Sequence, residues 1–94
     1  MIDESLSGTP EERLAALGLV LPPTPRPVAR YQPQMTAGSV VVTSGVLPMQ
    51  DGRVLTGRLG DSMTVEAGVA AARQAALLAL SSLAAGAGGL QRIA

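Results

Sequence analysis

Apolar and polar positions follow a different pattern in each third of the chain, and the first third predicts a short helix. The segment Thr9–Glu12 reads Thr-Pro-Glu-Glu, which places an N-cap, a first-turn proline and a capping-box glutamate in order. Leu14 and Leu17 then form an apolar stripe before Gly18, a typical helix stop. We therefore expect a helix near residues 10–17. Because so short a helix is unstable alone, its two leucines should dock on another element.

The middle of the chain, residues 28–59, has the pattern of β structure. The run Val40–Thr43 is β-branched and almost continuously apolar, as in a strand covered on both faces. Thr36–Gly38 is a turn signal before it, and Asp51-Gly52 after it is the strongest short hairpin signal. We therefore predict a three-strand antiparallel meander, in which Val54–Thr56 is the returning strand.

The last third is dominated by Ala and Leu at helical spacing. Thr64 is a suitable N-cap, and Glu66 places a negative charge in the first turn, where the helix dipole favours it. We expect a long helix over residues 65–85 that packs on the sheet and is ended by the glycines that begin at Gly86. After it, Leu90–Ala94 is typical of the beginning of another strand.

A proline-rich segment separates the first helix from the β region. Leu21–Pro27 holds four prolines in seven positions, which predicts a stiff, extended connector. We interpret it as a tether lying on a sheet edge, and a proline-rich ligand for signalling domains is the alternative. The chain is thus divided into residues 1–27, a helix with its tether, and residues 28–94, the main domain.

Composition narrows the possible functions. The 94 residues are 47% hydrophobic and 15% charged, which is typical of one small folded domain. The chain has no Cys and no His, so it lacks disulfides, thiol chemistry, zinc–thiolate sites and His-dependent nucleophiles. The only aromatic residue is Tyr31, so the core must be aliphatic and small, and we expect a partner surface to supplement it.

The charge and hydropathy of the chain indicate which partners it binds and where in the cell it is located. The formal net charge is zero and every cation is an Arg, a poor footprint for nucleic acid. The uncharged stretch Ala75–Leu90 is shorter than about 18 residues and rich in small residues, so we expect no membrane span. The acidic start is unlike a signal peptide, which predicts a cytoplasmic protein.

The order of the motifs is more specific than any one of them. It runs from Tyr31 through the strand Val40–Gly45 and Leu47-Pro48 to the hairpin, then to the Thr64 cap of an Ala-rich helix. This order resembles the Rid/YjgF family of reactive-intermediate deaminases, over nearly all of the chain. The opening Thr9–Gly18 and the proline tether are similar to the longer YjgF-like branch of that family.

The resemblance implies a fold and an activity. The fold would be α+β and chorismate-mutase-like, with the N-terminal helix, the three-strand meander and one long helix packed on the sheet. The family forms homotrimers with sites between subunits. Its members hydrolyse 2-imino acids and enamines released by pyridoxal-phosphate enzymes, without metal or cofactor, and carry an older endoribonuclease label. By resemblance, Tyr31 would lie at the pocket wall, and Ser44 and Gly45 would bind substrate. No catalytic residue is identified.

Two departures keep other interpretations open. Val46 stands where the family usually has Gln, and no residue matches the family's carboxylate-clamping Arg, which lies on a later strand. We therefore expect a C-terminally truncated domain, with an exposed sheet edge that makes it unstable or self-associating. A non-catalytic trimeric binding or scaffold protein, or a remnant, is the alternative. Likewise Tyr31 could be sheet packing, and Ser44-Gly45 a strand-ending turn.

Overall fold

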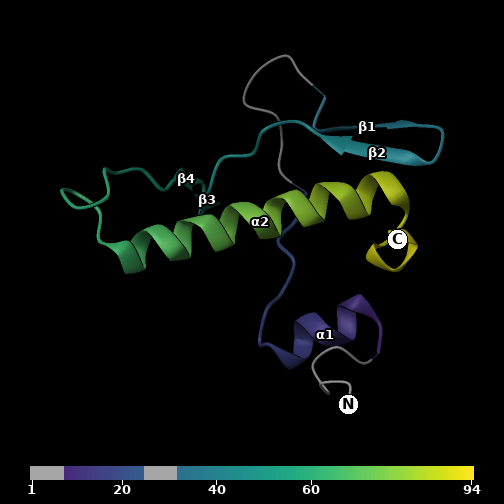
Figure 1. Ribbon diagram of the computed structural model, residues 1–94, viewed down its shortest axis with the longest axis horizontal. Coiled ribbons are helices and arrows are strands. Elements are labelled where there is room, and N and C mark those ends of the chain that lie inside the picture. Colours follow the sequence, from purple (N-terminus) through teal and green to yellow (C-terminus); the bar gives the residue numbers. More distant parts are fainter. Residues whose placement is uncertain (1–7, 25–31) are drawn as a thin grey trace.

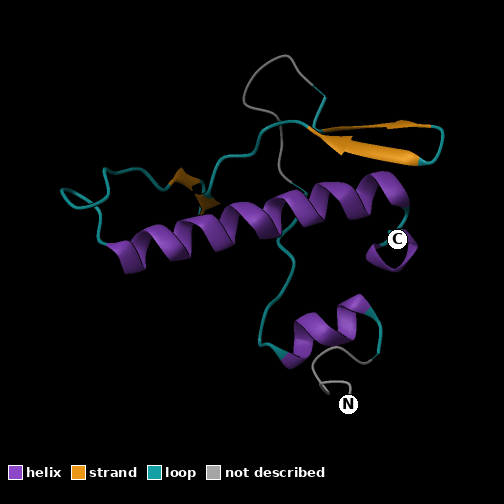
Figure 2. Cartoon of the chain, viewed as in Figure 1, coloured by secondary structure: helices purple, strands orange, loops and turns teal. Residues whose placement is uncertain are grey.

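The structure, a computed structural model, describes residues 8–24 and 32–94. Its elements are short except for one helix, and in chain order they are α1 (Pro10–Ala16), β1 (Gln34–Ala37), β2 (Val40–Thr43), β3 (Met49–Gln50), β4 (Arg53–Val54), α2 (Val65–Ala87) and the 3-10 turn η2 (Leu90–Arg92). The long helix α2 lies between the β1–β2 hairpin and α1 (Figure 1). This is the predicted α+β class, with antiparallel strands against one long helix (Figure 2).

The helix α2 begins as predicted and ends later than predicted. The backbone N–H of Ala67 donates to Thr64 Oγ1 at 3.1 Å, which confirms the N-cap. The helix continues through Gly86 and stops at Gly88, whose φ of 87° is left-handed. Gly86 lies inside the helix and the hairpin packs on it: a Cβ there would stand 2.8 Å from Gln34 Cγ and 2.9 Å from Val41 Cγ2.

The structure confirms the predicted N-cap of α1, but only one of its two leucines docks on another element. The backbone N–H of Glu12 donates to Thr9 Oγ1 at 3.1 Å, and Gly18 follows the helix with a φ of 73°. The helix packs on η2, with Leu14 half-buried. Leu17, in contrast, is 63% exposed, so the prediction that it docks was wrong for the described chain.

The described part of the tether lies on a helix and not on a sheet edge. Ser81 Oγ of α2 donates to the main-chain oxygen of Pro22 at 2.8 Å and lies 3.4 Å from Thr24 Oγ1. The interpretation of a tether along a sheet edge was therefore wrong for these residues. The rest of the tether falls outside the described residues.

The predicted three-strand meander is replaced by two separate hairpins. In the first, β1 and β2 pair from Gln34↔Thr43 to Ala37↔Val40; in the second, β3 pairs with β4 and not with β2. Pro48, which has no N–H to donate, stands between β2 and β3, and the returning strand is only two residues long. The Asp51-Gly52 turn itself is confirmed, because both residues have positive φ, 52° and 77°, as a type I′ hairpin requires.

The strand β2 is covered on one face, not on both as predicted. Val41 is half-buried against α2, whereas Val40 and Val42 are 56% and 59% exposed. Successive side chains of a strand point to opposite faces, so one helix covers only every second valine. The outward face is therefore apolar and open in the described chain.

The core is centred on α2. Its buried apolar residues are Ala71, Leu77, Leu78 and, from η2, Leu90. The segment from Leu90 forms this 3-10 turn and only Ile93 beyond it is extended, so the prediction of a strand beginning at Leu90 was wrong.

By length and composition, α2 could also cross a membrane, with a mean hydropathy of 1.3 and 28% of the tested window buried. A single helix of this kind is weak evidence for a span, because core helices of soluble proteins have the same properties. The absence of a membrane partner stays a prediction.

Candidate functional site

Ser44 is held at the end of β2 by two hydrogen bonds to the segment that leads into β1. Its backbone N–H donates to the carbonyl of Pro33 at 3.1 Å, and its hydroxyl donates to the carbonyl of Gln32. The two bonds extend the β1–β2 pairing beyond the Gln34↔Thr43 pair. Ser44 is therefore positioned by strand pairing, on a half-buried site at the open end of the hairpin.

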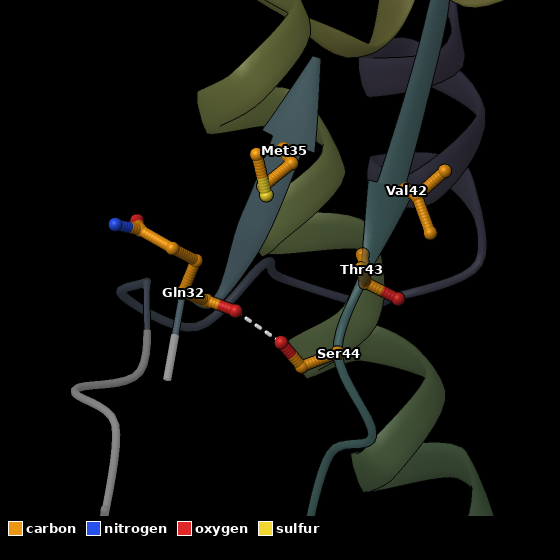
Figure 3. Close-up of a pocket in the computed structure, with 5 residues that line it drawn as sticks. All are labelled: Gln32, Met35, Val42, Thr43 and Ser44. Carbon is orange, nitrogen blue, oxygen red and sulfur yellow. Dashed lines mark hydrogen bonds between the residues drawn. The ribbon is translucent and has the colours of Figure 1, made fainter. Parts of the chain in front are cut away.

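A cavity of about 410 Å³ opens at this end of the hairpin (Figure 3). Its lining side chains come from both strands and their extensions: Gln32, Met35, Val42, Thr43 and Ser44. Met35 and Val42 are directly paired across the strands and contribute an apolar wall. None of these five residues carries a charge, so the cavity combines an apolar wall with neutral polar groups.

The hydroxyl of Ser44 is suited to accept hydrogen bonds from a ligand. Its one proton is directed at the main-chain oxygen of Gln32, while the Gln32 side chain points away from Ser44 (Figure 3). A hydroxyl oxygen has two lone pairs, which stay available when its proton is donated. The group can therefore accept from an N–H or from a bound water in the cavity.

Gly45 is exposed and does not line this cavity. Its φ is not positive, and a Cβ at this position would meet no atom within 4 Å. Neither backbone conformation nor packing within the described chain requires a glycine here. Ser44 and Gly45 form no turn, so the alternative interpretation of the pair as a strand-ending turn was wrong. The missing side chain of Gly45 leaves open space beside Ser44.

Of the three residues expected at the site, Ser44 lines the cavity. Gly45 follows Ser44 in the chain and does not line the cavity. Tyr31 lies outside the described residues, so the expectation that it lines the pocket stays a prediction. No motif in the sequence singles out Gln32, Met35 or Thr43 as site residues. The β1–β2 register accounts for two of them, because it pairs Met35 with Val42 and places Thr43, the partner of Gln34, next to Ser44.

A second cavity, of about 740 Å³, lies at the other end of the hairpin. It is bounded by the Gly38-Ser39 turn, the C-terminal end of α2 and Arg92. Ile93, in extended conformation, also lines it. No expected site residue lies there, and among the described residues no cluster of acidic side chains could hold a metal ion.

Known proteins resemble this chain in both sequence and structure. Residues 11–94 match the family described as "YjgF/chorismate mutase-like, putative endoribonuclease". The curated Protein TCP17 of Trypanosoma cruzi is 40% identical over 88 residues, which are 93% of this chain and 55% of that protein.

A solved structure gives the same result for the fold. The crystal structure of a "putative endoribonuclease" from Shewanella oneidensis MR-1 matches with a TM-score of 0.82 and 42% sequence identity, over 90% of this chain and 57% of the solved one. The chain thus spans little more than half the length of these relatives. The family match covers nearly all of it, and the fold agrees with a solved member, so the chain belongs to the YjgF/chorismate-mutase-like family.

Proposed function

We propose that this chain forms part of a cofactor-independent hydrolase that deaminates 2-imino acids and enamines. The observation that carries the proposal is the cavity at the end of β2, where Ser44 offers an acceptor beside an apolar wall and next to a glycine that the fold itself does not require. A small 2-imino acid has an N–H to donate and an aliphatic side chain to bury, so this lining suits it.

The chemistry needs positioning more than a nucleophile from the protein. Water adds to the imine carbon, the carbon–nitrogen bond breaks, and a 2-oxo acid and ammonia leave. Ser44 Oγ would accept a hydrogen bond from the imine N–H or from the attacking water and hold it in line. The substrate carboxylate requires a cation, and the five lining residues provide none. We therefore propose that the clamping cation comes from outside this cavity.

We further propose that the site is completed between copies of the chain, as a homotrimer. The outward face of the β1–β2 hairpin supports this: it carries Met35, Ala37, Val40 and Val42, whereas its helix-facing side carries Gln34, Thr36, Thr43 and only one valine. A hairpin on a monomer would place its apolar side chains against the helix and its polar ones in water. The reversed pattern fits a sheet whose outer face is buried by another subunit.

The test is hydrolysis of a 2-imino acid generated in the assay by an amino-acid oxidase, followed as ammonia released above the spontaneous rate. Wild type should exceed the buffer rate. Ser44→Ala should lower the excess at least ~10-fold, the loss of about one hydrogen bond to the reacting group, and Gly45→Ala should lower it without changing stability. Ser39→Ala, at the exposed far end of the hairpin, is the matched control and should keep the rate.

Release at the buffer rate by wild type would refute the deaminase and favour the alternative, a non-catalytic binding or scaffold protein. The matching family and the solved relative are both described as putative endoribonucleases. A second assay therefore tests cleavage of a labelled single-stranded RNA. We expect no cleavage, because the chain has zero net charge and a single aromatic residue. RNA cleavage that Ser44→Ala abolishes would overturn the deaminase proposal in favour of a nuclease.

A further inference from the structure

Gln74 is a half-buried polar residue on the mostly apolar helix α2. Leu77 and Leu78 follow it at intervals of three and four, so the three residues share a face, and both leucines are buried. A carboxamide on such a face costs free energy unless it is hydrogen-bonded. Gln74 Nε2 donates to the main-chain oxygen of Met49 at 2.8 Å, which offsets that cost and links α2 to β3.

The carbonyl of Met49 is available for this bond because the β3–β4 pairing does not use it. Met49 is paired with Val54, and the neighbouring bond runs from the N–H of Leu55 to the carbonyl of Pro48 at 2.9 Å. Hydrogen-bonded and non-hydrogen-bonded pairs alternate along an antiparallel ribbon, so Met49 and Val54 form a non-hydrogen-bonded pair. The Met49 carbonyl therefore points away from β4 and toward α2.

Met49 also ends the segment that leaves the cavity at Ser44. Residues 45–48, which we call the site segment, lie between β2 and β3, two strands that both pack on α2 (Figure 1). Before the site segment, Ser44 is held by its two hydrogen bonds to the residues that lead into β1. After it, Met49 is held by Gln74. The site segment is thus attached at both ends, and one attachment is a helix side chain.

The length of the chain between the strands explains why the attachment at Gln74 matters. The hairpin rests on Gly86 through Val41, and Gly86 lies twelve residues after Gln74, about 18 Å along the helix axis. The eight residue steps from Val41 to Met49 could span about 26 Å if fully extended. This path has slack, so without the bond from Gln74 the site segment would shift relative to Ser44.

We propose that Gln74 is a positioning residue of the site at Ser44, acting through the Met49 carbonyl on the site segment. This role rests on the proposed function. The site segment begins at the open space beside Gly45, next to Ser44, where a small ligand would lie. A segment that is already held in place spares the ligand the entropy cost of ordering it, so the bond to Met49 strengthens ligand binding. Gln74 itself lines neither of the two cavities described above.

The test measures the binding of 2-oxopentanoate, a short aliphatic 2-oxo acid of the product class, to the full 94-residue chain by calorimetric titration. Gln74→Met keeps the approximate size and the helix propensity of the side chain but removes its N–H donor. It should raise Kd about 3-fold to 10-fold, the loss of about one hydrogen bond, and raise KM for the 2-imino acid by the same factor with kcat unchanged. Arg73→Met, at the exposed neighbouring position, is the matched control and should keep both constants.

A structural role and a positioning role of Gln74 have different effects in this titration. If Gln74 only stabilised the fold, Gln74→Met would lower the fraction of binding-competent protein and leave Kd unchanged, and the proposal would be overturned. Hydrogen exchange adds a measurement that needs no ligand. In Gln74→Met, the amides of residues 46–49 should exchange at least ~3-fold faster, while β1 and β2 keep their wild-type rates. Unchanged exchange at residues 46–49 would contradict the attachment.

Failure of the proposed function gives a different set of results. If wild type binds 2-oxopentanoate and Gln74→Met binds it more weakly, the positioning role is supported even where no imine is hydrolysed. If wild type hydrolyses the imine and Gln74→Met has the same Kd and KM, the positioning role is wrong and the deaminase stands. A wild-type chain that neither binds 2-oxopentanoate nor hydrolyses the imine refutes both.

Discussion

Gly86 is the residue at which α2 and the β1–β2 hairpin come into close contact, and it offers a direct test of that packing. A Cβ at Gly86 would stand 2.8 and 2.9 Å from the side chains of Gln34 and Val41, which are themselves held by strand pairing. We expect Gly86→Ala to lower the free energy of unfolding by ~1 kcal/mol. Overpacking costs about 1–3 kcal/mol, and the better helix propensity of Ala offsets up to about 1 kcal/mol.

Gly68→Ala is the matched control on the same helix. Its Cβ would meet the end of the Leu59 side chain, which is exposed and able to rotate away. The propensity gain should then dominate, and stability should stay equal or rise by up to about 1 kcal/mol. Urea unfolding followed by circular dichroism measures both variants. Equal effects of the two substitutions would mean that the hairpin does not rest on Gly86.

The residues of the site show which features of a single residue can be predicted from sequence and which cannot. Ser44 could be singled out because a serine and a glycine follow an apolar strand and resemble a family motif. Its partner, the carbonyl of Gln32, could not be inferred from residue type, because every residue has a carbonyl and only the strand register selects this one. Fully buried Ser82, which lacks a hydrogen-bond partner among the described residues, likewise has no sequence signal.

At the scale of elements, the Asp51-Gly52 turn decides whether the β3–β4 ribbon forms. Gly52 has a φ of 77° and nothing within 4 Å of its would-be Cβ, so an added side chain meets a backbone penalty and no clash. We expect Gly52→Ala to destabilise the chain by about 1 kcal/mol. Gly45→Ala, which has open space and no positive φ, should leave the melting temperature unchanged. A Gly52→Ala variant as stable as wild type would show that the ribbon contributes nothing to folding.

The cap of α2 is the second test at this scale. Thr64 Oγ1 accepts the backbone N–H of Ala67, so Thr64→Ala leaves that donor without its side-chain partner. Thermal unfolding should show a loss of ~1 kcal/mol, and Thr64→Ser should restore most of it because Ser provides the same oxygen. If Thr64→Ser were as unstable as Thr64→Ala, the methyl group and not the hydrogen bond would be responsible.

The two helix caps and the type I′ turn were predictable because each depends on residues within four positions of one another. Strand pairing depends on contacts between distant residues, and there the prediction of a meander was wrong. Val54–Thr56 has the composition of a strand, but Pro48 and the two-residue length of β3 and β4 leave it paired only locally. Likewise Gly86 looks like a helix stop in sequence, but α2 continues through it, and the hairpin packed on it explains why a glycine stands there.

At the scale of the molecule, exposed apolar faces accompany the small aliphatic core that the composition predicts. The described chain buries four apolar residues, while Val40 and Val42 of β2 and Val65 and Val69 of α2 remain exposed. So few buried methylenes stabilise a domain only weakly. Association at either face would add apolar burial that the chain does not supply alone.

The apolar outward face of the β1–β2 hairpin leads to a prediction about the oligomeric state of the chain. If Met35 and Val42 lie between copies, the chain should sediment as a multiple of 9.5 kDa, and its unfolding midpoint should rise with protein concentration. Val42→Lys should give a species near 9.5 kDa, because a Lys at a paired, apolar position would lose its hydration in the interface. Val20→Lys, although more exposed, lies on the N-terminal segment and should not change the mass. A wild-type monomer with a concentration-independent midpoint would contradict the trimer, and dissociation by Val20→Lys instead of Val42→Lys would move the contact away from the hairpin.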